Sequence, residues 1–162
     1  MNILILGTSG VHHTLIAANM LLDRFKGELT TMKGYCDTWL DRSGCPIYVG
    51  TDRDGHRVYT LGVGRELKVA RKALGSMLEL FRDSPHQVVV TEITIQGELW
   101  IRMAMLCSHL PWGRRVNELI SGRVLRGQLP RIQSQVERLR AQIGLASGEG
   151  GNHGALLERV AQ

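Results

Sequence analysis

Residues 2–14 read NILILGTSGVHHT, and this stretch decides the fold class. A short apolar run, Asn2 to Leu6, leads into a turn of small residues and then into a helical pattern. This order predicts a strand, a tight turn and the start of a helix. The first amides of a helix lack intrahelical acceptors and the helix dipole adds partial positive charge, so such a turn can hold an anion. The sequence therefore predicts an anion site here.

The turn is spaced like the Walker A phosphate-binding loop, G-x-x-x-x-G-K-[ST]. Gly7 and Thr14 match that pattern, whereas His12 replaces its second glycine and His13 its lysine. A mostly neutral imidazole is a poor substitute for the cation that a nucleoside triphosphatase needs at the β- and γ-phosphates. We interpret the turn as a phosphate-binding loop; the alternative is a tight turn whose glycines only permit close packing. The predicted binding residues of the turn are Gly7, Thr8, Ser9, Gly10, His12, His13 and Thr14.

Length, cysteine content and apolar runs limit the class of protein. The chain has 162 residues, enough for one domain with a core, which we place at 1–144 with a flexible tail at 145–162. The three cysteines form no C-x-x-C pair and cannot all be paired, which favours a reducing, cytoplasmic setting. No stretch approaches the roughly 20 apolar residues that span a bilayer, and the N-terminus lacks a basic region. We predict a cytoplasmic protein that neither enters a membrane nor is exported.

Strands and helices alternate along the rest of the chain. Two strands, 47–51 and 57–61, should form a hairpin across Asp52-Arg53-Asp54-Gly55. The other expected elements are helices at 11–25, 65–82, 98–110 and around 132–143, strands at 28–31 and 86–95, a loop at 32–44, and a strand or arginine-bearing loop at 116–125. The sequence thus predicts an α/β fold with a small, open, mostly parallel sheet, helices on both faces and a β-hairpin, in a P-loop-like or Rossmann-like three-layer architecture.

Glu92 follows the apolar run Val88-Val89-Val90 and resembles a Walker B carboxylate. If that strand runs parallel to the first, both strand ends lie at the same rim, where such sheets bind ligands. Glu92 could then hold a magnesium ion or orient a water, with His12 donating a hydrogen bond or shuttling a proton. The alternative is a glutamate that pairs with a nearby arginine. His12 and Glu92 are the predicted catalytic residues; the cofactor is unknown, magnesium being the candidate, and we assign no protein metal site.

Positive charge is concentrated between residues 113 and 140, which contain seven arginines, two glutamates and no lysine. Arginine suits planar, bidentate contacts with phosphate or carboxylate. Arg114, Arg115 and Arg123 are candidates to close over a bound anion, whereas Arg131, Arg138 and Arg140 are most simply a solvated helix face. Since no aromatic residue follows Trp112 in this region, a stacking platform is missing, which argues against nucleic acid.

Cys36 to Ser43 also fit the spacing C-x-x-x-x-x-R-[ST] of cysteine phosphatases. That loop must be tight and small, and Trp39 and Leu40 do not suit it. We therefore regard this match as a chance recurrence of a short pattern.

The chain resembles an uncharacterised bacterial family, a domain of unknown function from mostly spore-forming, Gram-positive lineages. The resemblance rests on Gly10-Val11-His12 with Thr14, on the hairpin Val49 to Gly55, on Val58 to Gly62 behind it, and on Gly122-Arg123. It covers about residues 1–143. The resemblance implies a single small α/β domain and names no reaction.

The leading hypothesis is a protein that binds a phosphorylated small molecule or nucleotide at the first turn, with phosphoryl transfer or hydrolysis as the reaction if it is an enzyme. The alternative hypothesis is a non-enzymatic interaction or regulatory protein that binds an acidic partner through its arginine-rich face. Whether a homodimer forms through the Trp39 loop or the Trp100 helix is left open by the sequence.

Overall fold

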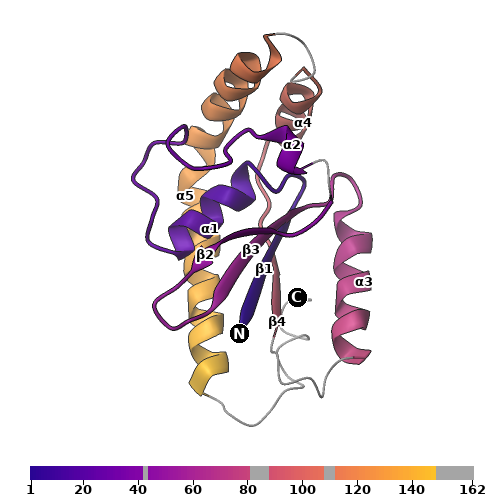
Figure 1. The fold of residues 1–162 in the computed structure, drawn as a ribbon, viewed down its shortest axis with the longest axis vertical. Helices are drawn as coiled ribbons and strands as arrows, with labels where there is room; N and C mark the ends of the chain where they lie inside the picture. Colours follow the sequence, from indigo (N-terminus) through magenta and orange to yellow (C-terminus); the bar gives the residue numbers. More distant parts are fainter. Residues whose placement is uncertain (42–43, 81–87, 108–111, 149–162) are drawn as a thin grey trace.

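A computed structural model of the chain describes residues 1–41, 44–80, 88–107 and 112–148 (Figure 1). Within these ranges it is a mixed α/β structure with a four-stranded open sheet. The elements in chain order are β1 (Asn2–Gly7), α1 (His13–Leu21), α2 (Thr38–Asp41), β2 (Ile47–Thr51), β3 (Arg57–Gly62), α3 (Leu67–Leu80), β4 (Val88–Glu92), α4 (Glu98–Cys107) and α5 (Gly113–Gly148). None of the described helices combines the length and the apolar character that crossing a membrane requires.

The sheet has the strand order β2-β3-β1-β4. β1 lies at its centre and pairs in parallel with β3 and β4, while β2 adds to β3 as an antiparallel edge. The predicted hairpin is confirmed, and Gly55 has a φ of 82°, the left-handed conformation that this turn requires. The Val88 strand, β4, runs parallel to β1, which is the condition under which the two strand ends lie at the same rim.

Alternate side chains of β1 face two separate apolar layers. Ile3 and Ile5 pack into the main core with α1 and α5, whereas Leu4 and Leu6 pack on the opposite face, where Leu67 and Leu74 of α3 cover them. Figure 1 shows α3 on one side of the sheet and α1 with α5 on the other. The predicted arrangement of an open sheet with helices on both faces is therefore correct.

The connections that leave β1 and β3 turn toward opposite faces of the sheet. β1 leads into α1 on the Ile3 face, and β3 leads into α3 on the Leu4 face. In open α/β sheets, adjacent strands whose connections diverge in this way leave a crevice at their carboxyl ends, and ligands bind there. In this chain the crevice lies between Gly7 and Gly62, which are paired in the register of β1 and β3.

α1 is shorter than the predicted 11–25 helix, and the expected strand at 28–31 is wrong, since these residues form bends and turns. Asp23 has a φ of 56° and Gly27 a φ of 90°, which no helix can continue through. Arg140 of α5 donates hydrogen bonds to the carbonyl oxygens of Met20 and Leu21 and pairs with the Asp23 carboxylate. The guanidinium of Arg140 thus caps the carboxyl end of α1.

α5 is one helix from Gly113 to Gly148, so the expectation of a strand or loop at 116–125 is wrong. Two of the inward positions in its first half are polar, Asn117 and Ser121, both fully buried, before the apolar Leu125; Ile132, Val136 and Leu139 fill the inward positions further along. Apolar periodicity alone therefore does not reveal the first half as a helix. Pro130, which lacks an amide, lies inside the helix and marks the change in pattern.

Several predicted boundaries lie outside the described residues. These are the end of the 65–82 helix, the first residues of the 86–95 strand and the last residues of the 98–110 helix. α5 includes residues 145–148, and 149–162 fall outside the description, so the division into a domain and a tail stays a prediction.

Candidate anion site and buried polar cluster

The turn after β1 is closed by hydrogen bonds within the protein. The Thr14 hydroxyl donates to the carbonyl oxygen of Ser9 at 2.6 Å, and the Val11 amide donates to the Ser9 hydroxyl at 3.3 Å. In a Walker A loop the hydroxyl at the position of Thr14 faces a metal ion, whereas here it forms a hydrogen bond within the turn. Ser9, His12, His13 and Thr14 are all fully buried.

A carboxylate of the protein lies in the crevice between β1 and β3. The Gly10 amide donates to Asp41 Oδ1 at 2.8 Å, and the Ser9 hydroxyl donates to Asp41 Oδ2 at 2.7 Å. Side chains at Gly10 or Gly62 would collide with this carboxylate, which explains glycine at both positions. Burial raises the pKa of Asp41, while the two hydrogen bonds act against that rise. The Gly10 amide and the Ser9 hydroxyl thus donate to a carboxylate of the protein itself, and binding of an external anion at the turn stays a prediction.

His12 continues the hydrogen-bonded chain that begins at Asp41. Its Nδ1 lies 2.7 Å from the Ser9 hydroxyl oxygen. Because that hydroxyl donates to Asp41, Nδ1 must carry the proton and donate to Ser9, which leaves Nε2 as an acceptor. Burial lowers the pKa of His12 to about 4, so the ring is neutral near pH 7.

Asn117 and Cys36 both approach the acceptor nitrogen of His12. Asn117 Oδ1 lies 3.2 Å from Nε2, while Asn117 Nδ2 is buried without a partner. Rotating the amide by half a turn makes Nδ2 the donor to Nε2, which gives both groups a partner. Cys36 Sγ lies 3.5 Å from the same nitrogen. Cys36 has a φ of 57°, a strained conformation for a residue with a side chain.

Tyr35 and Ser121 complete this buried group. Ser121 donates to the carbonyl oxygen of Asn117 at 2.5 Å, so the Tyr35 hydroxyl, at 3.1 Å, donates to Ser121. Burial raises the pKa of Cys36 to about 11, with the contacts to Ser121 and Tyr35 opposing the rise. Burial also raises the pKa of Tyr35. We call this group the His12 cluster; its members are Ser9, His12, Tyr35, Cys36, Asn117 and Ser121.

The His12 cluster joins three segments, namely the first turn, the loop before α2 and the first half of α5. Its thiol is protonated and its imidazole is neutral, and Cys36 exposes only 3% of its surface. A nucleophilic cysteine needs a thiolate and an accessible face. The arrangement therefore positions the turn, and the cysteine phosphatase pattern gains no support from it; Arg42 and Ser43 of that pattern lie outside the described residues.

His13 is fully buried, and neither ring nitrogen has a side-chain or backbone partner of good hydrogen-bond geometry. Burial lowers its pKa to about 3; the neighbouring His12 lowers it further, while the backbone of Ile93 acts in the opposite direction. A side chain at Gly7 would strike the His13 ring, so Gly7 is glycine because of close packing. This agrees with the alternative interpretation of Gly7.

A cavity of about 280 Å³ lies beside Asp41, on the outer side of the turn. We call it the Thr8 pocket; it is lined by Thr8, Thr38, Asp41, Gly64, Arg102, Met105 and Leu106. The Thr8 residue is nine-tenths buried, and its hydroxyl has no hydrogen-bond partner in the part of the chain that the structure describes. Arg102, half-buried on α4, makes no ion-pair contact among the described residues. Burial raises the pKa of Glu98, one turn earlier in α4, and the charge of Arg102 acts against that rise, so the two groups interact at longer range. The pocket thus contains one cation without a contacting carboxylate, one hydroxyl without a partner among the described residues and one carboxylate that is already hydrogen-bonded.

Glu92 and the three predicted arginines do not line the Thr8 pocket. Glu92 lies 3.5 Å from Arg71 of α3, the arginine pairing that was the alternative interpretation. That contact places it on the α3 side of the sheet, whereas the His12 cluster is on the α5 side. Arg114 pairs with Glu118 at 3.1 Å, and Arg115 and Arg123 line a separate hollow on α5.

Three residues at this site were missed from the sequence, namely Asp41, Arg102 and Asn117. Arg102 had a usable signal, because α4 begins at the same sheet edge as the first turn and an arginine in its second turn can reach that edge. Asp41 comes from a loop without periodicity, and Asn117 from a segment not expected to be helical. Neither had a signal in the pattern of apolar residues.

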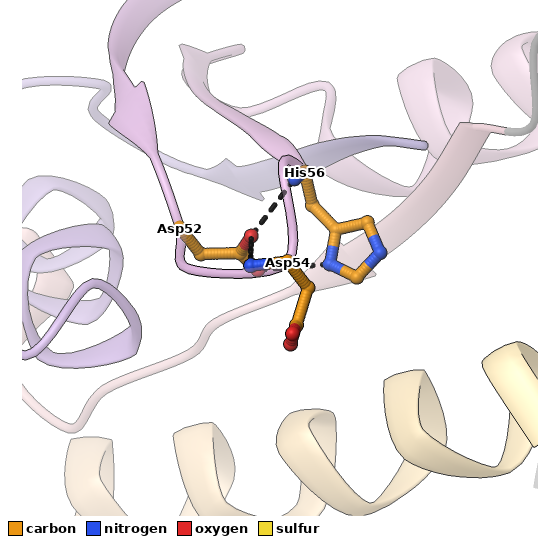
Figure 2. A group of neighbouring side chains, drawn as sticks. All are labelled: Asp52, Asp54 and His56. Carbon is orange, nitrogen blue, oxygen red and sulfur yellow. Dashed lines mark hydrogen bonds and ion pairs between the residues drawn. The ribbon is translucent and has the colours of Figure 1, made fainter.

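Asp52, Asp54 and His56 form a group whose possible ligand atoms lie within 4.8 Å of one another (Figure 2). The Asp52 carboxylate accepts hydrogen bonds from the amides of Asp54 and His56 and from the His56 ring, at 2.8–3.0 Å. Burial acts to raise the pKa of Asp52, but the hydrogen bonds from His56 lower it overall. Figure 2 shows the Asp54 carboxylate directed away from these contacts. The hydrogen bonds of Asp52 therefore stabilise the hairpin turn, and this role explains why the three side chains lie together.

The fold and site define a small α/β protein with an internal carboxylate at its strand-end crevice and a pocket beside it. Residues 2–141 match the family described as "Protein of unknown function (DUF3189)", and the chain belongs to this family. The predicted resemblance to a domain of unknown function is thereby confirmed, while the bacterial, spore-forming lineage stays a prediction. No curated protein and no solved structure matches the chain.

Proposed function

We propose that this protein binds a phosphorylated small molecule in the Thr8 pocket, at the carboxyl ends of β1 and β3. The observation that carries the proposal is the buried Thr8 hydroxyl, without a partner among the described residues, which lines the same cavity as Arg102. A buried polar group without a hydrogen bond costs about 1–3 kcal/mol, so such groups in a native structure call for a ligand or water. A phosphate accepts from both a hydroxyl and a guanidinium.

The proposal moves the phosphate away from the amides of the turn. The Gly10 amide already donates to Asp41 and the Val11 amide to Ser9, so neither is available to an anion. We place the phosphate against Arg102 and Thr8. It lies beside the Asp41 carboxylate, which keeps its own hydrogen bonds to the turn. The Rossmann-like architecture belongs to the same proposal: the divergent connections of β1 and β3 support it, since Rossmann folds bind nucleotides at such a crevice.

Asp41 restricts the ligand to one that tolerates a carboxylate. Its carboxylate oxygens each accept one hydrogen bond from the protein, and each keeps a lone pair. A compound with hydroxyl or amino donors beside its phosphate, such as a nucleoside monophosphate or a sugar phosphate, satisfies both Arg102 and Asp41. A magnesium ion shared by Asp41 and the phosphate would serve the same end. The proposal is one of binding, because Glu92 and His12 lie on opposite faces of the sheet and neither lines the pocket.

Thermal unfolding in the presence of inorganic phosphate, nucleoside monophosphates and sugar phosphates, each with and without magnesium, tests this proposal. A compound at about one hundred times its dissociation constant should stabilise the protein by about 2.7 kcal/mol, a rise in Tm of roughly 5–10 °C. Thr8→Val and Arg102→Gln should each remove most of that rise. Arg138→Gln, which removes an exposed arginine from a different helix, α5, is the matched control and should leave the rise in Tm unchanged.

Two results would contradict the proposal. One is the absence of any Tm shift for the unmodified protein across the whole set of phosphorylated compounds. The other is a shift that Arg138→Gln reduces as much as Arg102→Gln does, because this would indicate diffuse attraction to a basic protein.

A further inference from the structure

A second hollow, of about 850 Å³, lies between the first half of α5 and the loop that contains Thr30. Three arginines line it: Arg115, Arg123 and Arg126. We call it the arginine groove. None of the three has an ion pair or side-chain hydrogen bond among the described residues. In contrast, two other arginines of α5 are paired, Arg114 with Glu118 and Arg140 with Asp23.

The charge of the arginine groove is therefore uncompensated within the described chain. Its one lining carboxylate is Glu118, which is already held by Arg114. Guanidinium groups that share one hollow without a counter-charge repel one another, and an anionic ligand relieves this repulsion. Arginine also forms bidentate hydrogen bonds with carboxylates and is enriched at protein interfaces.

The spacing of the lining residues along α5 indicates the shape of a ligand that would fit the arginine groove. Arg115, Leu119, Gly122 and Arg126 follow the i, i+4, i+7, i+11 pattern and share one helix face. The two arginines are about 16 Å apart along the axis, at about 1.5 Å per residue. Between them, Leu119 exposes 74% of its surface, and Gly122 has no side chain to fill the hollow. The face is thus positive at both ends with an apolar centre.

We propose that the arginine groove binds an acidic segment of a partner protein, with carboxylates at both ends and an apolar residue between them. About five residues of extended chain span the distance between the arginines. Trp112, which is 81% exposed one turn before Val116, adds an aromatic residue to the same end of α5. Tryptophan and arginine are the residues that most often dominate binding energy at protein interfaces. No aromatic residue lines the groove itself, which disfavours stacking of nucleic-acid bases.

Fluorescence anisotropy with the labelled peptide Glu-Glu-Ala-Leu-Ala-Glu-Glu tests the proposal on the full chain. The double variant Arg115→Gln/Arg126→Gln should weaken binding at least roughly tenfold, as expected for losing two charge-assisted contacts. The double variant Arg131→Gln/Arg138→Gln removes the same charge from exposed positions of the same helix and should bind like the unmodified protein. Leu119→Ser should weaken binding of this peptide but not of the peptide in which its leucine is replaced by serine.

Three outcomes would overturn the proposal. The first is no binding of either peptide to the unmodified protein at low salt. The second is an equal loss of affinity in both arginine double variants, which indicates diffuse attraction. The third is tighter binding of single-stranded oligothymidine with the same dependence on Arg115 and Arg126, which assigns the groove to nucleic acid. Because Thr8 and Arg102 play no part here, these outcomes are independent of the Thr8 pocket.

Discussion

Asp41 Oδ1 accepts a hydrogen bond from the amide of Gly10 at 2.8 Å, across a sequence separation of 31 residues. This contact brings the short helix α2 onto the turn after β1 and fills the crevice between two parallel strands. A position where other α/β proteins hold a ligand anion is thereby occupied by the protein's own carboxylate. The contact also fixes where the Thr8 pocket begins, since Asp41 forms one of its walls.

Replacing Asp41 tests how much this carboxylate stabilises the turn. Asp41→Ala should lower the free energy of unfolding by about 1–3 kcal/mol, because the Gly10 amide and the Ser9 hydroxyl lose their acceptor. Asp41→Asn should cost less, since its amide oxygen can still accept from Gly10. Urea unfolding measures both. Asp54→Asn, at an exposed carboxylate of the hairpin turn, serves as the control, and a similar loss there would contradict this role for Asp41.

Glycine substitutions should separate close packing from backbone freedom. Gly62→Ala places a methyl group against the Asp41 carboxylate and the Gly10 amide, and Gly7→Ala places one against His13. Each should destabilise the protein by about 1–3 kcal/mol or more, as overpacked cores do. Gly75→Ala, in an open position of α3, should instead stabilise it by about 0.5–1 kcal/mol through helix propensity. Equal effects at the three positions would refute the packing argument.

Stability should fall as the pH drops below about 6.5. Burial lowers the folded-state pKa values of both histidines, to about 4 for His12 and about 3 for His13, from the 6.5 that is usual for histidine. The unfolded chain therefore binds more protons in the window between these values, and the two groups together contribute a slope of up to about 2.7 kcal/mol per pH unit. The raised pKa of Asp41 acts in the opposite sense at lower pH.

Urea unfolding at a series of pH values measures this slope. His13→Asn should reduce the slope of unfolding free energy against pH to about half, because one of the two titrating histidines is lost. This expectation holds whatever the variant's stability at pH 7. A slope in the variant equal to that of the unmodified protein would show that His13 is not the buried group that resists protonation.

Arg140 should stabilise the carboxyl end of α1 locally. Arg140→Gln removes the donor to the carbonyl oxygens of Met20 and Leu21 and the ion pair with Asp23. Because the contacts with Met20 and Asp23 are exposed and the contact with Leu21 is partly buried, we expect a loss of about 1 kcal/mol. Amide hydrogen exchange should become faster in the last turn of α1. Arg138→Gln should leave both quantities unchanged; the same loss there would contradict the capping role.

The alternating pattern was sufficient to predict the sheet and its helices on both faces. The apolar run of β1, the turn at Gly55 and the stripe from Leu67 to Leu74 are local signals, and local signals determine local structure. The strand order was left open by the sequence, and the parallel pairing of β1 with β4 comes from the structure.

The first half of α5 and the composition of the site could not be predicted in the same way. Asn117 and Ser121 are buried because they meet Tyr35, Cys36 and His12, so their burial depends on contacts between distant segments. A helix whose inward face is polar gives no apolar period to detect. The same holds for Asp41, whose role is defined by the Gly10 amide and by nothing in its neighbouring sequence.

One helix holds α1 at both of its ends. Near the start of α5, Asn117 contacts His12 just before α1 begins, and Arg140 caps the last turn of α1. The two helices therefore cannot tilt or slide against each other without breaking contacts at one end. We expect the amides of α1 and of the facing half of α5 to open together in native-state exchange, as a single cooperative unit that is lost last.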